Sequence, residues 1–280
     1  MAFSRHTTRK RFGQHWLRDG SILDQILDAA DLIETDRVLE IGPGQGALTE
    51  RLLSTPACSI HTIELDRDLV AGLNHRFGQN NRFSLQQGDA LKASLDDPYG
   101  RAANKVVANI PYNITGPLLE RLLGSLQTPR EPAFEKLVLL VQKEVAERIL
   151  AKPGESNFSA MSVRLQLMAK AQSICRVPPH CFRPPPKVQS EVIALAPFQS
   201  DQRIHGALAK EVAELLRHAF SSRRKMLSNS LVQLTPKDEL TRIAVEAGVS
   251  LKQRPQDLSP NSWINLAKCF MQNNHLSNQE

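Results

Sequence analysis

The chain has 280 residues, a formal net charge of +6, 41% hydrophobic residues and 23% charged residues. This composition is ordinary for a globular protein with a buried core, and no apolar run approaches the roughly 18 residues of a membrane-spanning helix. The four cysteines include no C-x-x-C pair, so we expect no metal site, and few scattered thiols favour a cytoplasmic location.

The first half of the chain alternates between short β-branched runs and amphipathic stretches. We expect strands at 37–41, 60–65, 83–87, 105–109 and 136–141, with helices at 21–33, 47–53, 69–77, 117–126 and 143–150. Alternating strands and helices predict an α/β fold with a parallel sheet covered by helices on both faces.

The pattern changes after residue 152. We expect a helix at 159–171, an extended proline-rich stretch, a late strand at 191–195 that pairs antiparallel, and then helices at 204–220, 223–232, 238–247 and 259–272. The chain therefore divides into an N-terminal arm at 1–18, an α/β domain at 19–200 and a small helical domain at 201–280.

The charges are distributed unevenly among these parts. Residues 1–18 carry five basic and no acidic side chains, whereas residues 19–150 carry 13 basic and 19 acidic ones. Residues 151–200 and 201–280 are again basic. The pattern favours a polyanionic partner held by the arm and the C-terminal half, although ordinary solvated faces would give similar counts.

A glycine-rich loop follows the first strand of the α/β domain and opens the next helix. It reads Glu40-Ile-Gly42-Pro-Gly44-Gln-Gly46. The third glycine comes one residue earlier than in the dinucleotide fingerprint G-x-G-x-x-G. This spacing suits a loop over a nucleoside without a pyrophosphate, and it resembles the S-adenosylmethionine loop of class I methyltransferases.

Two acidic residues follow at the ends of the next strands. Glu64 can accept hydrogen bonds from both ribose hydroxyls, and Asp89 can accept one from an adenine amino group. Either acid alone is more simply read as a loop cap. Because both lie at the sheet edge where open α/β sheets bind ligands, together they predict an S-adenosylmethionine site.

The fourth strand ends in Asn109-Ile-Pro111-Tyr112. This run resembles the [D/N/S]-P-P-[Y/F/W] element of enzymes that methylate exocyclic amines. An Asn carbonyl can accept an N–H bond of adenine N6 and direct its lone pair at a methyl group. Tyr112 offers a flat face to a flipped base, and Pro111 fixes the turn. The alternative is a simple β-turn capped by Asn109.

These motifs occur together in one known family. The chain carries, in order, Arg9-Lys-Arg-Phe-Gly-Gln14, Glu40-Ile-Gly-Pro-Gly44, Ile63-Glu-Leu-Asp-Arg-Asp68, Asn109-Ile-Pro-Tyr112, Phe182-x-Pro-Pro-Pro-Lys-Val188 and Phe220-x-x-Arg-Arg-Lys225. Over roughly residues 9–270 it resembles the small-subunit ribosomal RNA adenine N6,N6-dimethyltransferases of the KsgA type. The resemblance implies a class I methyltransferase domain that methylates two adjacent adenosines near the 3′ end of that RNA, within an assembling ribosomal particle.

The resemblance also implies roles for individual residues. The cofactor contacts would be His15, Leu17, Gly42, Gly44, Glu64, Asp89 and Asn109. The target base would meet Asn109, Pro111, Tyr112 and Phe182. The RNA contacts are expected from the charge distribution rather than from the resemblance, and they are Arg9, Lys10, Arg11, Arg223, Arg224 and Lys225. The chain departs from the family at His15, where Asn is usual. We expect a monomer that binds no membrane.

Three other functions remain possible from the sequence. One is a macrolide-resistance type adenine methylase of large-subunit RNA, which has a similar target loop. Another is an RNA-binding assembly factor without turnover, which the intact Asn109–Tyr112 run disfavours. A dinucleotide oxidoreductase is disfavoured by the glycine spacing.

Overall fold

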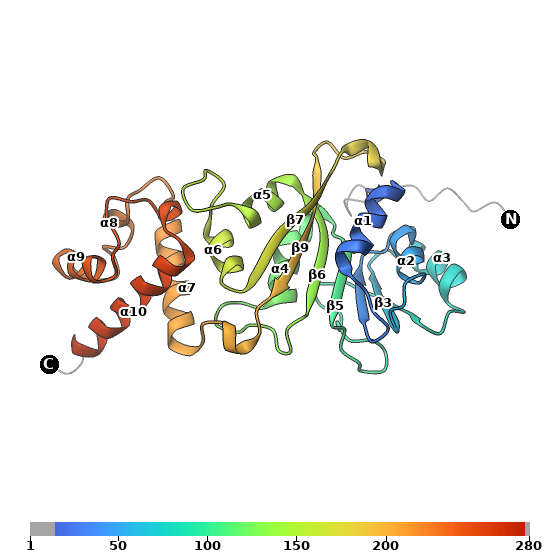
Figure 1. Ribbon diagram of the computed structural model, residues 1–280, viewed down its shortest axis with the longest axis horizontal. Helices are drawn as coiled ribbons and strands as arrows, with labels where there is room; N and C mark the ends of the chain where they lie inside the picture. The colour runs from blue at the N-terminus through green and yellow to red at the C-terminus, as the bar shows by residue number, and fades with distance from the viewer. Residues whose placement is uncertain (1–14, 278–280) are drawn as a thin grey trace. The chain divides into compact units, whose positions relative to one another are not determined.

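The structure is a computed structural model that describes residues 15–277. The chain packs as two units (Figure 1). Within the described residues, the first unit comprises 15–123, Arg130–Ala146 and Ala171–Pro197, and the second comprises Gly124–Pro129, Glu147–Lys170 and 198–277. The packing boundary after Pro197 lies close to the boundary expected at residue 200. Residues 147–170, expected within the α/β domain, instead pack with the C-terminal helices. The functional division of the chain stays a prediction.

The first unit is built on a seven-stranded mixed sheet with the order β4-β3-β2-β5-β6-β9-β7. The strands are β2 (Arg37–Ile41), β3 (Ser59–Glu64), β4 (Phe83–Gln87), β5 (Lys105–Asn109), β6 (Lys136–Gln142), β7 (Ala169–Val177) and β9 (Ser190–Pro197). Strands β2 to β6 pair in parallel, and β9 pairs antiparallel to β6. The predicted parallel sheet and its late antiparallel strand are confirmed.

Five helices lie before or after the parallel strands in the chain. They are α1 (Gly20–Ala30), α2 (Ala47–Leu52), α3 (Arg67–Phe77), α4 (Thr115–Leu123) and α5 (Lys143–Leu150), with short 3₁₀ turns η2 (Tyr112–Ile114) and η3 (Pro179–Cys181). Helix α1 begins after Asp19, whose carboxylate accepts hydrogen bonds from the N–H groups of Ser21 and Ile22. Such a cap satisfies helix donors that have no intrahelical partner.

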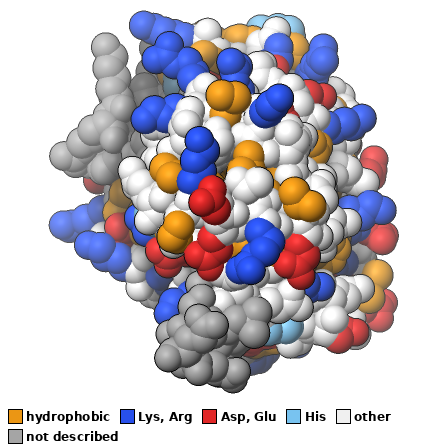
Figure 2. All heavy atoms as spheres, turned by 90° about the vertical axis from the view of Figure 1, so that its left-hand side faces the viewer, with side chains coloured by type: hydrophobic (Ala, Val, Ile, Leu, Met, Phe, Trp, Pro, Cys, Tyr) orange, Lys and Arg blue, Asp and Glu red, His pale blue; other side chains and the backbone are white. Residues whose placement is uncertain are grey.

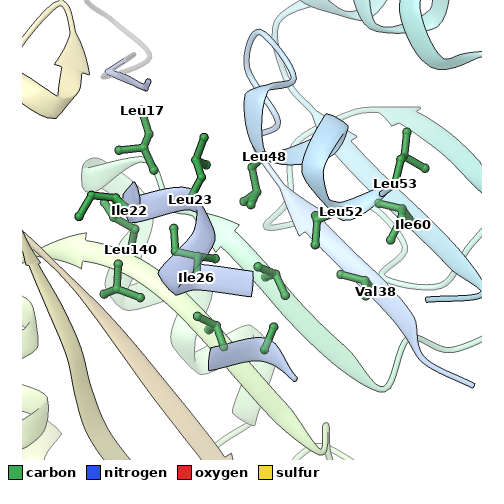
Figure 3. Packing of buried hydrophobic residues seen from close by; sticks show 14 of the residues in the cluster. Leu17, Ile22, Leu23, Ile26, Val38, Leu48, Leu52, Leu53, Ile60 and Leu140 are labelled. Atoms are coloured by element: carbon green, nitrogen blue, oxygen red, sulfur yellow. The ribbon is translucent and has the colours of Figure 1, made fainter. Parts of the chain in front are cut away.

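One apolar cluster of the first unit lies between its sheet and helices α1 and α2. Ile26 of α1 and Leu52 of α2 are at most 1% exposed, as are Val38 of β2 and Leu140 of β6. Figure 3 shows these side chains in one apolar cluster. The i, i+3, i+4 spacing of apolar residues in α1 produces the buried stripe that the sequence predicted.

A two-stranded sheet joins the start of the described chain to its proline-rich segment. Strand β1 (Trp16–Leu17) pairs antiparallel with β8 (Phe182–Arg183), with Leu17 opposite Phe182. The N–H of Arg18 extends this pairing by donating to the carbonyl of Cys181 at 2.9 Å. The pairing fixes the segment before α1 at one end of the first unit.

The second unit is helical. It contains α6 (Ala160–Gln166), α7 (Gly206–Phe220), α8 (Leu227–Ser230), α9 (Lys237–Glu246) and α10 (Pro260–Ser277), with 3₁₀ turns η4 (Ser200–Gln202) and η5 (Pro255–Asp257). Helix α7 packs on α10, where the Phe220 and Trp263 rings lie 6.0 Å apart. Trp263 is completely buried. In the described part of the chain, no helix combines the length and the apolar character needed to cross a bilayer.

Two expected helices were wrong in part. The helix expected at 159–171 ends at Gln166, and Ala169–Val177 forms strand β7 beside β9. Backbone pairing to a neighbouring strand overrides local helix propensity there. The helix expected at 223–232 is reduced to the single turn of α8, and Arg223–Lys225 lie in a turn before it.

Candidate active site

A cavity of about 500 Å³ opens in the first unit at the carboxyl ends of the parallel strands. Its lining includes most of the cofactor and target residues expected from the sequence: His15, Leu17, Gly42, Gly44, Glu64, Asp89, Asn109, Pro111 and Tyr112. Parallel strands deliver their carboxyl ends to one sheet edge, so residues far apart in the sequence meet there. The predicted cofactor and target motifs therefore share one cavity.

The glycine loop forms one wall of this cavity. Gly44 and Gly46 have φ values of +59° and +82°, which L side chains rarely adopt. A Cβ on Gly46 would lie 2.6 Å from the Phe77 ring, and one on Gly44 would lie 3.0 Å from Trp16. The loop thus needs glycine for both its backbone conformation and its close packing, and it leaves bare backbone facing the cavity.

Glu64 is fixed at the end of β3. It is buried, and its carboxylate accepts the N–H of Gly44 at 3.1 Å on Oε2 and the N–H of Asp66 at 2.8 Å on Oε1. Burial raises its pKa, and the two backbone hydrogen bonds oppose that rise. A carboxylate has about four acceptor positions, so two remain for ligand hydroxyls.

Asp89 organises the turn after β4. Its Oδ1 accepts the N–H of Leu91 at 2.9 Å, and its backbone carbonyl accepts the N–H groups of Lys92 and Ala93 at 2.8 Å. The side chain is half-buried and lines the cavity. The turn presents an acceptor at the strand next to the one that carries Glu64.

Glu40 is a further cavity residue that the sequence analysis did not assign to the site. It lies in β2, is 1% exposed, and its Oε2 accepts a hydrogen bond from the Thr49 hydroxyl at 2.7 Å. Burial raises the pKa of Glu40 from its ordinary 4.5 to about 8, and the nearby Glu64 charge adds to the rise. Its signal in the sequence is a charged residue inside the otherwise apolar run Val38–Ile41.

This pKa gives a prediction for stability. The folded protein keeps the Glu40 proton up to about pH 8, whereas the unfolded chain loses it near pH 4.5. The contribution of Glu40 to the free energy of unfolding is therefore full below about pH 4.5 and is lost as pH rises to about 8. In Glu40→Gln this decline should be smaller, by on the order of a few kcal/mol. Denaturant titrations at about pH 5 and about pH 8.5 measure it, and equal declines in both proteins would contradict it.

The target loop lies beside the glycine loop. A Cβ on Gly42 would lie 3.6 Å from the Pro111 ring. The Asn109 amide donates through Nδ2 to the carbonyl of His15 at 3.3 Å, so its Oδ1 stays available as an acceptor. The Tyr112 hydroxyl is 2.6 Å from the Ser190 hydroxyl, and burial raises the Tyr112 pKa. Ser190 is fully buried, and sequence reasoning did not single it out.

His15 contributes a ring to the same region. It stacks on Tyr112 with ring centroids 5.7 Å apart and planes 26° apart, and its Nδ1–H donates to the Pro184 carbonyl at 2.9 Å. Because a carbonyl only accepts, this hydrogen bond places the proton on Nδ1. The side chain that departs from the usual Asn thus joins the target loop to the proline-rich segment.

Phe182 does not lie where packing against a target base would require it. It is 4% exposed, belongs to the apolar cluster that contains Leu17, and does not line the cavity. Stacking on a target base would require it to leave this core, so that role stays a prediction without support from its position.

The predicted RNA-binding residues fall into two groups. Arg9, Lys10 and Arg11 lie outside the described residues. In the second unit, Arg223 donates to the carbonyls of Ser156 and Phe158 at 2.6 and 2.9 Å. Arg224 and Lys225 are exposed. Figure 2 shows Lys and Arg side chains spread over one face, with acidic side chains among them.

Across residues 15–277, no group of three or more His, Cys, Asp or Glu side chains could hold a metal ion.

Comparisons with known proteins agree with this geometry. A family model described as ribosomal RNA adenine dimethylase matches residues 5–272. The chain belongs to this family. Among its relatives, ribosomal RNA small subunit methyltransferase A from Synechococcus sp. strain WH7803 is 60% identical over 96% of both chains. The protein of the same name from Parasynechococcus marenigrum strain WH8102 is 59% identical over 96% of this chain and 89% of its own.

Solved structures of other proteins show the same fold. A dimethyladenosine transferase from Plasmodium falciparum is 30% identical, with a TM-score of 0.77 over 90% of this chain and 96% of that one. The 23S rRNA methyltransferase ErmE is 23% identical, with a TM-score of 0.72 over 91% and 99%. At that identity ErmE supports the fold alone. The predicted class I methyltransferase fold is confirmed, and the names of the relatives favour the small-subunit over the large-subunit reading.

Proposed function

We propose that this family member transfers methyl groups from S-adenosylmethionine to N6 of two adjacent adenosines in the 3′-terminal hairpin of small-subunit ribosomal RNA. The observation that carries the proposal is the single cavity shared by Glu64, Asp89 and the Asn109–Tyr112 loop. The enzyme would act as a monomer in the cytoplasm, on an assembling ribosomal particle.

The cavity residues fit S-adenosylmethionine by the chemistry of their donors and acceptors. Glu64 and Asp89 supply carboxylate acceptors for ribose hydroxyls and an adenine amino group, and the glycine loop admits the ligand close to the backbone. The bound cofactor supplies an electrophilic methyl group on a positively charged sulfur. Glu40 adds a buried carboxyl to the same lining.

Asn109 would direct the attacking nitrogen. The lone pair of adenine N6 is delocalised into the ring, so the amine is a weak nucleophile until it becomes pyramidal. The Oδ1 of Asn109 is the amide atom that can accept an N6–H bond, and the hydrogen bond from Nδ2 to the His15 carbonyl orients the amide. That interaction strengthens as the nitrogen becomes tetrahedral, so it favours the transition state over the ground state.

Tyr112 would stack on the flipped adenine. In Tyr112→Ala we expect RNA binding in the productive pose to weaken by about 1–3 kcal/mol, the usual value of stacking one base. Tyr112→Phe should retain most activity, since only the hydrogen bond to Ser190 is removed. Steady-state rates with small subunits test both variants, and equal decreases in Ala and Phe would show that the hydroxyl rather than the ring matters.

The whole proposal is tested with labelled S-adenosylmethionine and unmethylated small ribosomal subunits. We expect four methyl groups on two adjacent adenosines by mass analysis of the RNA. Parallel reactions with large subunits test the macrolide-resistance alternative, and micromolar calorimetric binding of NAD without binding of S-adenosylmethionine would point to an oxidoreductase. Incorporation into neither subunit would leave the non-enzymatic assembly factor.

A further inference from the structure

An arginine on α4 holds the turn that carries Asp89. Arg121 donates through one terminal nitrogen to the carbonyl of Leu91 at 2.7 Å and through the other to the carbonyl of Ala93. A guanidinium presents its donors as a rigid planar fork, so two carbonyls bound at once fix the orientation of the turn.

The same turn is tied from within by Asp89. The Asp89 carboxylate accepts the N–H of Leu91, and its carbonyl accepts the N–H groups of Lys92 and Ala93. The N–H groups of residues 91–93 are thus bound to Asp89, and two carbonyls of this stretch are bound to Arg121. Asp89 and Leu91 line the cavity, whereas Arg121 does not. Arg121 therefore acts on the cavity through the turn and not by touching a ligand.

The surroundings of Arg121 are in part unfavourable for the stability of the fold. Its Nε is buried without a hydrogen-bond partner among residues 15–277, and such a group is destabilising. A second cation lies near: burial lowers the pKa of Arg130, and the charge of Arg121 lowers it further against the opposing effect of Asp96.

Helix α4 also connects this turn to the target loop. The 3₁₀ turn η2 (Tyr112–Ile114) runs directly into α4, which begins at Thr115. Arg121 lies within α4. The helix that follows the Asn109–Tyr112 loop therefore also carries the side chain that binds the Asp89 turn. Arg121 thus links the Asp89 turn to the helix that follows the target loop.

We propose that Arg121 is a positioning residue for the adenosine end of S-adenosylmethionine, because its fork on Leu91 and Ala93 fixes the Asp89 carboxylate. This inference rests on the proposed function. Removing the fork would leave the turn held only by its bonds to Asp89 and would weaken the hydrogen bond that the Asp89 carboxylate accepts from the ligand. The methionine end of the cofactor would meet residues outside this turn and would keep its interactions.

The chain offers a matched control in Arg82. Its guanidinium donates to the carbonyls of Thr55 and Ala57 at 2.8 and 2.9 Å, and also to that of Leu53. Arg82 does not line the cavity. Replacing it removes the same kind of arginine–carbonyl hydrogen bond from the same unit, so it reports the purely structural effect.

The test compares wild type, Arg121→Met, Arg121→Lys and Arg82→Met by calorimetry with S-adenosylmethionine and with 5′-methylthioadenosine, which lacks the amino-acid end. In Arg121→Met we expect both ligands to bind about tenfold more weakly, the decrease associated with hydrogen bonds to a charged group. KM for S-adenosylmethionine should rise while kcat at saturation changes by less than about twofold. Arg121→Lys should weaken binding about threefold, because an ammonium lacks the fork.

Arg82→Met should lower the melting temperature and leave both affinities unchanged. The inference is overturned if Arg121→Met binds both ligands like wild type, or if Arg82→Met weakens binding as much. If Arg121→Met does not fold, Arg121→Lys decides instead. Wild-type affinity for both ligands in Arg121→Lys overturns the inference, and a decrease in affinity that Arg82→Met does not share supports it. A wild-type protein that binds neither ligand overturns the proposed function itself, and is thereby distinguished from a failure of Arg121 alone.

Discussion

Replacing Asn109 by alanine is expected to lower the single-turnover rate of methyl transfer by about 100-fold or more, while RNA affinity changes by less than about threefold. The reason is that its Oδ1 interaction matters most when N6 becomes tetrahedral, and a preorganised acceptor of this kind is worth roughly two to three orders of magnitude in rate. Rapid-quench assays with enzyme in excess over small subunits measure the rate directly.

The variant also removes the hydrogen bond from Asn109 Nδ2 to the His15 carbonyl. Cofactor affinity must therefore be measured alongside the rate, so that disturbance of the segment around His15 is separated from a change in the chemical step. Asn74→Ala, an exposed position on α3 that does not line the cavity, is the matched control. A near-normal rate for Asn109→Ala at saturating cofactor would remove this residue from the mechanism.

Much of the sheet was predictable because its signals are local. Arg37–Ile41, Phe83–Gln87 and Lys105–Asn109 have the expected bounds. Arg37–Ile41 and Lys105–Asn109 are short runs rich in apolar residues, as is typical of buried parallel strands, whereas Phe83–Gln87 alternates apolar and polar residues and is only half-buried. The cavity followed from the same reasoning, since residues at consecutive strand ends converge at one edge.

The missed elements depend on partners distant in the sequence. Strand β7 has mostly exposed or half-exposed residues without a clear alternation, and it is a strand because β9 lies beside it. Strand β1 is only two residues long and exists through its pairing with Phe182–Arg183. No local pattern distinguishes such segments from helix or loop, since β propensity mainly reflects neighbours across the sheet.

The residues in and around the site that the sequence did not predict also depend on partners distant in the sequence. Ser190 reaches Tyr112 across 78 positions, and Arg121 reaches Leu91 across 30. The residue types alone, a serine and an arginine, fit many surface positions. Glu40 had a usable sign, a carboxyl inside an apolar strand, but its burial and raised pKa follow only from three-dimensional packing.

The predicted binding of RNA by the second unit gives the other prediction with a large expected effect. Arg223 is held by the carbonyls of Ser156 and Phe158, so its replacement would disturb the turn before α8 as well as any interaction with RNA. Arg224 and Lys225 are exposed in the same turn. These two are therefore the better pair for testing the predicted basic surface.

We expect Arg224→Glu with Lys225→Glu to weaken binding to small subunits by about tenfold or more at low salt. The slope of log affinity against log salt should flatten by about one unit for each phosphate that the protein no longer neutralises, because fewer counterions are released. Affinity for S-adenosylmethionine should stay unchanged, since the residues that line the cavity all belong to the first unit. Filter binding over a salt series and calorimetry measure the two quantities.

The control must separate a local interaction from the change in net charge. Lys210→Glu with Lys268→Glu alters the charge of the second unit by the same amount at exposed positions of α7 and α10. A long-range field would respond equally to both double variants, with a modest decrease in affinity that high salt removes. Direct binding of phosphates by Arg224 and Lys225 would instead give a larger decrease and a flatter slope in that pair alone. Equal effects from the two double variants would place RNA recognition in the overall field rather than in this turn.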